Sequence, residues 1–256
     1  MAKVFLHGVP DTPFMWSPLI GALALEDADY VALSMPGFAA PAPAGFSSTK
    51  EAYLDWLIAS LEEIHGRSGP VDLVGHDWGA ILCVRAAHMR PDLIRSWMVS
   101  NALPDPDYQW HTMARQWQTP VLGELVMALA APKRMEGGLV QAGMPADIAA
   151  HEAPRFSRNM KRSILRLYRS AKMAGVEWGS DLSDLPDRGL VVWGELDPYV
   201  PLGVAERFCE RWNIPLHVER GAGHWAVCER PDAVAARLKS HWAGEAPAPT
   251  AADAPV

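Results

Sequence analysis

Short apolar runs alternate with longer stretches of helical periodicity along most of the chain. The apolar, β-branched runs predict strands at residues 3–7, 30–34, 71–76, 94–100, 190–194 and 216–219. Apolar residues spaced by three and four predict helices over residues 49–65, 78–89, 201–212 and 231–242. Because strands that alternate with helices are typical of βαβ units, the pattern predicts an α/β fold with a mostly parallel sheet of about six strands.

One long segment interrupts this alternation. Helical patterns continue from residue 103 to residue 187 without a convincing strand, and the strand-helix rhythm then resumes. We therefore expect residues 103–187 to form a helical cap over a core made of residues 1–102 and 188–243. Residues 244–256 are rich in Ala and Pro and lack periodicity, so we expect a disordered tail there.

Composition narrows the class of protein. Of the 256 residues, 49% are hydrophobic and 21% are charged, which is ordinary for a globular protein. A net charge of -7 without a basic stripe disfavours a nucleic-acid partner. The longest apolar stretch, residues 121–131, is too short to span a bilayer, and the N-terminus lacks signal-peptide features, so we expect no membrane partner. Three scattered Cys favour a reducing compartment, and hence the cytoplasm.

The amount of tryptophan is unusual. The chain has 11 Trp but only five Tyr and six Phe. Such an excess indicates either a heavily packed core or an aromatic pocket, since indole rings serve both purposes. The motifs around individual tryptophans decide between these two interpretations.

The most informative stretch is VDLVGHDWGAIL, in which a predicted buried strand runs through Gly75, Asp77 and Gly79 into a predicted helix. A Gly-x-nucleophile-x-Gly turn between a strand and a helix is the form of a nucleophile elbow. Asp77 could instead serve only as the N-cap of the helix. If it is the nucleophile, a carboxylate needs no base for activation and can displace a leaving group from saturated carbon to form an ester.

Two further motifs follow predicted strands. Asp197 occurs in GELDPYVP and His224 in GAGHWAV, so the chain order is nucleophile, acid, His, as described for α/β-hydrolases. Taken singly, Asp197 could be a turn residue and His224 a buried core imidazole. Together with Asp77, they predict a histidine base that is oriented by a carboxylate.

The first predicted strand ends in His7-Gly8-Val9-Pro10, where a turn would lie at the carboxyl edge of the sheet. The backbone N–H groups of Val9 and Trp78 could together form an oxyanion hole. The alternative is a plain strand-to-helix turn.

These motifs, HG-x-P, GHDWG, GELDPYVP and GHW, resemble the epoxide hydrolase and haloalkane dehalogenase branch of the α/β-hydrolase fold. The resemblance spans nearly the whole chain apart from the tail and is weakest in the cap. It implies an aspartate nucleophile and a helical cap. The family usually has two strands before the one that ends at His7, so we expect a sheet of about six strands without those two.

The leaving group separates the two activities. If the chain is an epoxide hydrolase, the resemblance implies two tyrosines in the cap that donate hydrogen bonds to the ring oxygen. Tyr168, which is followed by Arg169, matches the second position, and Tyr108 is the candidate for the first. Tyr168 could instead be a packing aromatic on a helix, and Tyr108 a surface aromatic on a loop.

A dehalogenase of this branch would hold the halide with indole N–H groups and an Asn in the first turn. Trp78 could supply one indole, and Trp110 or Trp117 another, but Val9 occupies the Asn position and has no side-chain donor. Fluoroacetate dehalogenases carry an Arg directly after the nucleophile, where this chain has Trp78. The fold also hosts ligand-binding proteins without activity, which remains an alternative of another class.

The sequence therefore favours the hydrolysis of an apolar epoxide to a vicinal diol. In this hypothesis Asp77 forms the ester, Tyr168 and Tyr108 assist ring opening, and His224, oriented by Asp197, activates water. We expect Trp16, Trp110 and Trp117 to contact the substrate. No metal-ligand spacing or nucleotide-binding motif occurs, so we expect no cofactor, a small apolar substrate and water as the reactants, and a monomer or homodimer.

Overall fold

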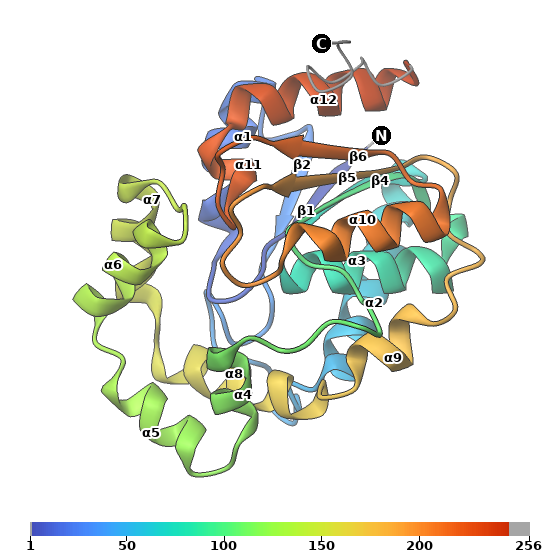
Figure 1. The fold of residues 1–256 in the computed structure, drawn as a ribbon. Coiled ribbons are helices and arrows are strands. Elements are labelled where there is room, and N and C mark those ends of the chain that lie inside the picture. Colours follow the sequence, from blue (N-terminus) through green and yellow to red (C-terminus); the bar gives the residue numbers. More distant parts are fainter. Residues whose placement is uncertain (1, 246–256) are drawn as a thin grey trace.

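The computed structural model describes residues 2–245, and a parallel six-stranded sheet forms its centre (Figure 1). The strands are β1 (Lys3–Leu6), β2 (Tyr30–Leu33), β3 (Val71–His76), β4 (Ile94–Ser100), β5 (Gly189–Gly194) and β6 (Leu216–Glu219). Their order in the sheet is β2-β1-β3-β4-β5-β6, and every neighbouring pair is parallel. The six predicted strands are confirmed, each with ends within one residue of those expected.

Helices cover both faces of the sheet. One face carries α1 (Ser17–Leu23), α11 (Ala226–Glu229) and α12 (Pro231–Ala243), and the other carries α2 (Lys50–Ser68), α3 (Trp78–Met89) and α10 (Leu202–Trp212). Side chains alternate between the faces, as the pleat of a strand requires. In β4, for example, Met98 packs on the α1 and α12 side, whereas Trp97 and Val99 pack on the α2 and α3 side.

Local signals explain where these helices begin and end. The Thr49 hydroxyl accepts a hydrogen bond from the Ala52 N–H and so caps α2, because this donor has no partner within the helix. Helix α3 begins at Trp78 and ends at Met89, as expected from the sequence. Helix α10 ends where Asn213 adopts a left-handed conformation, with φ of 52°.

Between β4 and β5 the chain forms helices and no strand. These helices are α4 (Thr112–Gln118), α5 (Leu122–Leu129), α6 (Pro132–Gln141), α7 (Ala146–Glu152), α8 (Arg158–Ser170) and α9 (Ala174–Gly179). Short 3-10 turns are η1 (Pro13–Trp16), η2 (Pro91–Leu93) and η3 (Ala153–Arg155). We call residues 103–187 the helical segment.

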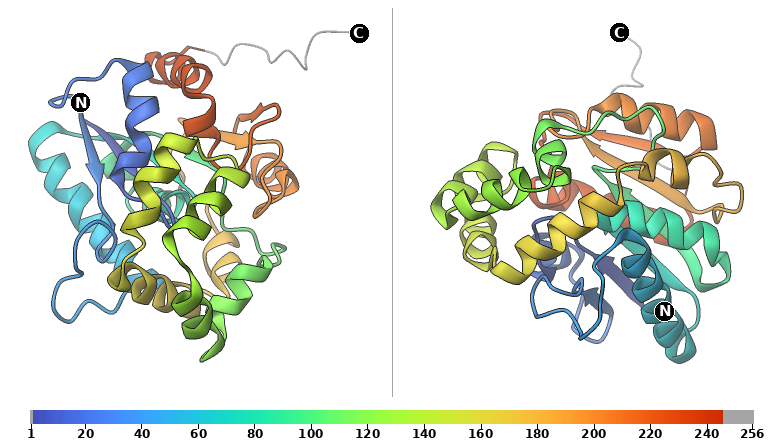
Figure 2. Two further views of the ribbon diagram at one scale, coloured as in Figure 1. Left: turned by 90° about the vertical axis from the view of Figure 1, so that its left-hand side faces the viewer. Right: turned by 90° about the horizontal axis from the view of Figure 1, so that it is seen from below.

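The helical segment packs against the core in two places. Ile164 and Leu167 of α8 join the apolar cluster that contains α2 and α3. Leu139 of α6 and Ile148 of α7 join the cluster that contains α1 and α12. Two views at right angles to Figure 1 show the segment folded against one end of the sheet (Figure 2).

Two further observations concern the chain as a whole. Among residues 2–245, no helix is both long enough and apolar enough to cross a membrane. The predicted tail, residues 244–256, lies outside the described residues except for Gly244 and Glu245.

Candidate active site

Asp77 lies at the sharp junction between β3 and α3. Its backbone adopts φ of 50° and ψ of -122°, a conformation that side-chain-bearing residues rarely occupy and that raises the local energy. Its side chain makes no capping hydrogen bond to α3. The surrounding structure therefore holds Asp77 in a strained turn without using its carboxylate to cap the helix.

The neighbouring glycines permit this turn by their lack of a side chain. A Cβ atom on Gly79 would clash with the Leu6 carbonyl oxygen, and one on Gly75 would lie 2.7 Å from the Gly79 carbonyl oxygen. Gly8 has the same role after β1, because its Cβ would clash with the Asp77 Cβ. Close approach of three backbone segments, rather than a positive φ, explains these glycines.

The two carboxylate oxygens of Asp77 face different partners. Oδ1 accepts a hydrogen bond of 2.7 Å from the Val9 N–H, and Oδ2 lies 3.5 Å from Nε2 of His224. Burial acts to raise the pKa of Asp77, but the hydrogen bond and charge of His224, and a hydrogen bond from the Trp78 backbone, lower it below the usual value. Asp77 is thus an ionised carboxylate at neutral pH, and both predicted oxyanion-hole donors, the Val9 and Trp78 amides, donate hydrogen bonds to it.

His224 lies between two carboxylates. Its Nδ1 is 2.8 Å from Oδ2 of Asp197, and its imidazole is buried. Burial acts to lower its pKa, but the charges and hydrogen bonds of Asp197 and Asp77 outweigh this effect and raise the pKa to about 10. His224 is therefore a positively charged imidazolium at neutral pH for as long as both carboxylates are charged.

Asp197 is fixed by more donors than the sequence indicated. Oδ1 accepts hydrogen bonds from the N–H groups of Tyr199 (2.8 Å) and Val200 (3.0 Å), and Oδ2 accepts one of 2.8 Å from the Asn101 side chain. Asn101 follows β4 with φ of 59°, and the Ser100 hydroxyl donates to its Oδ1. Sequence reasoning missed Asn101. Its signal was its place directly after a strand, because carboxyl ends of parallel strands meet at one edge.

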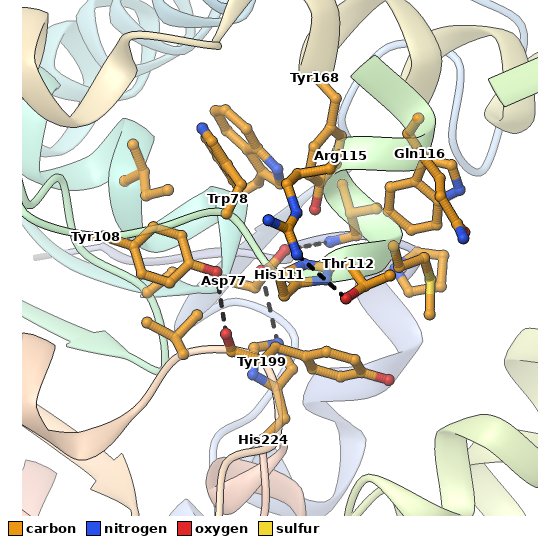
Figure 3. A pocket seen from close by; sticks show the side chains of 18 of the residues that line it. Asp77, Trp78, Tyr108, His111, Thr112, Arg115, Gln116, Tyr168, Tyr199 and His224 are labelled. Carbon is orange, nitrogen blue, oxygen red and sulfur yellow. Dashed lines mark hydrogen bonds and ion pairs between the residues drawn. The ribbon is translucent and has the colours of Figure 1, made fainter. Parts of the chain in front are cut away.

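A cavity of about 1250 Å³ lies above Asp77, between the sheet and the helical segment. From the sheet edge it is lined by Val9, Asp77, Trp78, Tyr199 and His224. From the helical segment it is lined by Tyr108, Trp110, Trp117, Tyr168 and apolar residues that include Met127 and Phe156. The predicted catalytic residues, apart from Asp197, thus lie on the wall of one pocket. Figure 3 shows Asp77, Tyr108, Tyr168 and His224 there.

Tyr168 points into this cavity from α8. Its ring packs within 5.5 Å, centroid to centroid, of Trp78, Trp110 and Trp117, and its hydroxyl is directed toward the space above Asp77 (Figure 3). Burial and the negative charge of Asp77 raise its pKa well above the usual value, partly offset by a hydrogen bond from the Trp78 side chain. Tyr168 is therefore a neutral phenol that can donate a proton or a hydrogen bond.

Tyr108 also lines the cavity, but its hydroxyl already has a partner. It donates a hydrogen bond of 3.0 Å to the Tyr199 carbonyl oxygen (Figure 3). Burial, with smaller contributions from Asp197 and Asp77, raises its pKa. To donate to a substrate, this hydroxyl would have to leave or share the Tyr199 carbonyl.

The three tryptophans expected to contact substrate divide into two groups. Trp110 and Trp117 line the cavity, and the buried indole N–H of Trp117 has no hydrogen-bond partner among residues 2–245. Trp16 does not line the cavity; it is fully buried, with its ring 5.3 Å from that of Phe5. This placement differs from the expectation because η1 directs the indole into the core instead of along the sheet edge.

Sequence reasoning missed two residues near the histidine, one in contact with its ring and one hydrogen-bonded to the next residue along the chain. The Tyr199 ring packs edge-on against His224 at 5.1 Å, and Asp11 is fully buried, with both oxygens 3.2 Å from the indole nitrogen of Trp225. Tyr199 was visible only as a part of the GELDPYVP motif. Asp11 gave no signal, because its neighbours along the chain do not reveal its burial.

Comparison with known proteins places this arrangement in a family. A model of the alpha/beta hydrolase family matches residues 4–237. The chain belongs to the alpha/beta hydrolase family. The six-stranded parallel sheet with its helices is the α/β-hydrolase fold that the motifs indicated.

Curated relatives of this family member match over part of the chain. An epoxide hydrolase from Caballeronia sordidicola is 37% identical over 98 residues, which are 37% of this chain and 29% of that protein. An (E)-2-((N-methylformamido)methylene)succinate hydrolase from Acinetobacter baylyi is 27% identical over 100 residues, or 39% of this chain and 37% of that protein. The matched stretches therefore span little more than a third of these relatives at most.

Solved structures agree with the fold along nearly the whole chain of this family member. An epoxide hydrolase from Vigna radiata has a TM-score of 0.74 at 19% identity, with 95% of this chain and 91% of that chain covered. A haloalkane dehalogenase from Bradyrhizobium elkani has a TM-score of 0.75 at 21% identity, with the same coverage. At such identities the likeness establishes the fold alone. The family assignment makes the chain an α/β hydrolase, and its substrate must be argued from the site.

Proposed function

We propose that this hydrolase opens an apolar epoxide to a vicinal diol through a covalent ester on Asp77. The observation that carries the proposal is the state of the Asp77 carboxylate. It is ionised and does not cap α3, and it has an amide donor at Oδ1 and the His224 imidazole beside Oδ2. A carboxylate in this position can act as a nucleophile, and water can then cleave the ester that it forms.

In the first step, Oδ2 of Asp77 attacks one epoxide carbon while the carbon-oxygen bond of the ring breaks. The ring oxygen receives a hydrogen bond and then a proton from Tyr168, whose burial keeps the phenol neutral. Tyr108 is the proposed second donor, once its hydroxyl is shared between the Tyr199 carbonyl and the substrate. The product of this step is a hydroxyalkyl ester on Asp77.

In the second step, ester formation itself prepares the base. Esterification removes the negative charge of Asp77, one of the two charges that hold the pKa of His224 near 10, so this pKa falls and neutral imidazole becomes available.

The proton that His224 gives up returns to the Tyr168 phenolate left by ring opening, and the neutral imidazole then takes a proton from water, whose oxygen attacks the ester carbonyl carbon. As this intermediate collapses, the bond between that carbon and the substrate oxygen breaks, and the substrate oxygen takes the remaining proton of the water to complete the diol. The Asp77 carboxylate and the charged imidazole are thereby restored. The oxyanion is stabilised by the Val9 and Trp78 N–H groups, and Asp197 stabilises the imidazolium.

The cavity supports an apolar substrate. Its walls are mostly aromatic and aliphatic, and the aromatic side chains of Trp78, Trp110, Trp117 and Tyr168 pack around one point above Asp77. Its volume of about 1250 Å³ exceeds the roughly 300–1,000 Å³ of most ligand pockets. We therefore propose an epoxide with a sizeable apolar substituent.

Single-turnover hydrolysis in heavy-oxygen water tests the covalent route. With enzyme in excess over an aryl or alkyl epoxide, the label should enter the Asp77 carboxylate, because water attacks the ester carbonyl carbon. Mass spectrometry of the peptide that contains Asp77 detects it. Label that appears only in the diol during this first turnover would rule out the ester.

A second candidate function is haloalkane dehalogenation with the same nucleophile. The observation in its favour is the buried indole N–H of Trp117, which lines the cavity and has no partner among the described residues. Against it, the Trp78 side chain donates to Tyr168, and Val9 offers no side-chain donor for a halide. A parallel assay of diol from epoxides and of chloride or bromide from haloalkanes separates the two functions.

A further inference from the structure

His111 is a polar residue of the cavity wall to which the proposed reaction gives no role. It lies directly before α4, at the end of the loop that follows β4. Its half-buried side chain lines the same cavity as Asp77 and Tyr168, and Figure 3 shows all three. The cavity therefore holds an imidazole besides the buried one of His224.

One ring nitrogen of His111 is bound to the helix that follows. Nδ1 accepts a hydrogen bond of 3.3 Å from the Ala114 N–H and thereby caps α4. A neutral imidazole carries its proton on the nitrogen that does not accept, so the proton of His111 is on Nε2. This Nε2 forms no hydrogen bond within the part of the chain that the structure describes. An N–H donor is thus available on the cavity wall.

The imidazole of His111 is neutral at neutral pH. Burial lowers its pKa to about 4, and the strongest of the charges that act on it is the negative charge of Asp77, which opposes this effect. The positive charges of His224 and Arg115 act in the same direction as burial. A neutral imidazole keeps its N–H proton, so His111 can donate a hydrogen bond without transferring a proton.

The hydroxyl of Tyr108, in contrast, has both of its hydrogen-bonding roles filled. It donates to the Tyr199 carbonyl oxygen at 3.0 Å, and it accepts a hydrogen bond from the His111 backbone, which partly offsets the effect of burial on its pKa. Tyr108 thus ties the loop before α4 to the loop after β5. To reach a substrate it would have to weaken a bond, whereas the Nε2–H of His111 has none to lose.

Two observations place His111 close to the reacting groups. The ring of Tyr199 lies 5.1 Å from that of His111 and 5.1 Å from that of His224, so one aromatic ring contacts both imidazoles. Among the charges that act on His111, and among those that act on Tyr168, Asp77 has the largest effect. The nucleophile thus has two neutral donors near it, one on α8 and one at the start of α4.

We propose that the Nε2–H of His111 donates the second hydrogen bond to the epoxide oxygen, beside the hydroxyl of Tyr168. This inference rests on the proposed function. As Asp77 attacks the carbon and the ring bond breaks, the oxygen takes the proton of Tyr168, and His111 stabilises the developing charge while it keeps its own proton. The arrangement requires no movement of Tyr108, which acts as a positioning residue through its bond to the His111 backbone.

The rate at which Asp77 is alkylated in single turnovers tests the proposal. His111→Ser keeps an N-cap on α4, because serine is among the best N-cap residues, but its short side chain does not carry a donor into the cavity. The variant should slow alkylation by roughly 10- to 100-fold, with little change in ester hydrolysis. A distorted site would slow both steps. His111→Gln, whose longer amide can donate, should recover part of the alkylation rate.

A matched control makes the same substitution outside the cavity. His65→Ser on α2 should leave both steps as they are in the wild type. Circular dichroism and urea denaturation show that each variant is folded. The double variant Tyr108→Phe/His111→Ser should be no slower than His111→Ser alone, because the effect of Tyr108 passes through His111.

Three results would overturn the proposal. They are unchanged alkylation in folded His111→Ser, equal slowing of both steps in that variant, and a loss in Tyr108→Phe that adds to the loss in His111→Ser. The last result would make the Tyr108 hydroxyl a donor in its own right. If the wild type forms no ester with any epoxide, the proposed function fails, and this inference fails with it.

Discussion

The sheet edge and the helical segment contribute to the same cavity, but they hold their side chains in different ways. At the sheet edge Asp77, Asp197 and His224 are fixed by backbone amides and by one another. In the helical segment Tyr168 is held by aromatic packing, and the Tyr108 hydroxyl is bound to a carbonyl of the core. In the proposed reaction the sheet edge therefore supplies charge and proton transfer, whereas the helical segment supplies shape and neutral donors.

This difference predicts where substitutions act. Changes at the sheet edge should abolish individual chemical steps for any substrate. Changes in the helical segment should alter the ring-opening step, the range of substrates that bind or the stability of the protein. The following predictions test that division.

The largest effect is expected at Asp77. Asp77→Gly should lower turnover by about 10⁴-fold or more, because no ester can form. It should also raise the free energy of unfolding by about 1 kcal/mol, because glycine relieves the strain of the positive φ. Kinetics and urea denaturation measure the two changes, with Asp77→Ala as the control that retains the strain. Substantial activity in the Asp77→Gly variant would contradict the role of Asp77.

His224→Gln should separate the two steps. Ester formation needs only the Asp77 carboxylate and should persist, while hydrolysis of the ester should slow by roughly 10³-fold or more without the base. Intact-mass spectrometry after mixing with epoxide should show accumulation of the alkylated chain. Failure of this species to accumulate, although turnover is lost, would argue against His224 as the base of the second step.

Tyr168→Phe should affect the step that opens the ring. Loss of one donor is expected to slow alkylation of Asp77 by roughly 10- to 100-fold, with little change in ester hydrolysis. Tyr108→Phe should have a smaller effect, because its hydroxyl is already bonded to the Tyr199 carbonyl. Stopped-flow measurement of both steps checks this order. Equal losses in both variants would indicate two equivalent donors.

Asn101→Ala should act through Asp197 rather than on the substrate. Loss of its hydrogen bond leaves the buried carboxylate less stabilised, and we expect ester hydrolysis to slow by about tenfold. In the wild type this step should accelerate as pH rises, with an apparent pKa below the value of about 10 for His224 in the free enzyme. The pH dependence of single-turnover hydrolysis in both proteins tests the expectation. Asn101→Asp, which places a third carboxylate nearby, should shift the profile to higher pH.

An effect on stability alone, with none on turnover, is expected from Glu152 on α7, whose carboxylate accepts a 2.8 Å hydrogen bond from Thr12 of the core. Burial raises its pKa to about 7, above the usual 4.5. The stability that it provides is therefore fully present below pH 4.5 and is lost as pH rises through about 7. Glu152→Gln should match the wild type at low pH and exceed its unfolding free energy by roughly 1–2 kcal/mol at higher pH. Denaturation at several pH values tests the sign.

Much of this organisation was predictable because it rests on local signals. The six strands follow from apolar runs, and the start of α2 follows from Thr49. The elbow follows from two glycines whose absent side chains let β1, β3 and α3 meet. The placement of Tyr168 in the cavity was also expected. Asn101 and Asp11 were not predicted, because their importance comes from partners about 96 and 214 residues away in the chain.

The sequence by itself determined the order of strands and helices, the strained turn at Asp77 and the types of residue that can perform the chemistry. Periodicity and glycine placement act over a few neighbouring residues, so they can be read without the fold. Only the tertiary structure decided which tryptophans face the cavity, that the Tyr108 hydroxyl is already bonded and that a groove runs between α5 and α8. These features depend on packing between distant segments, and local patterns do not encode it.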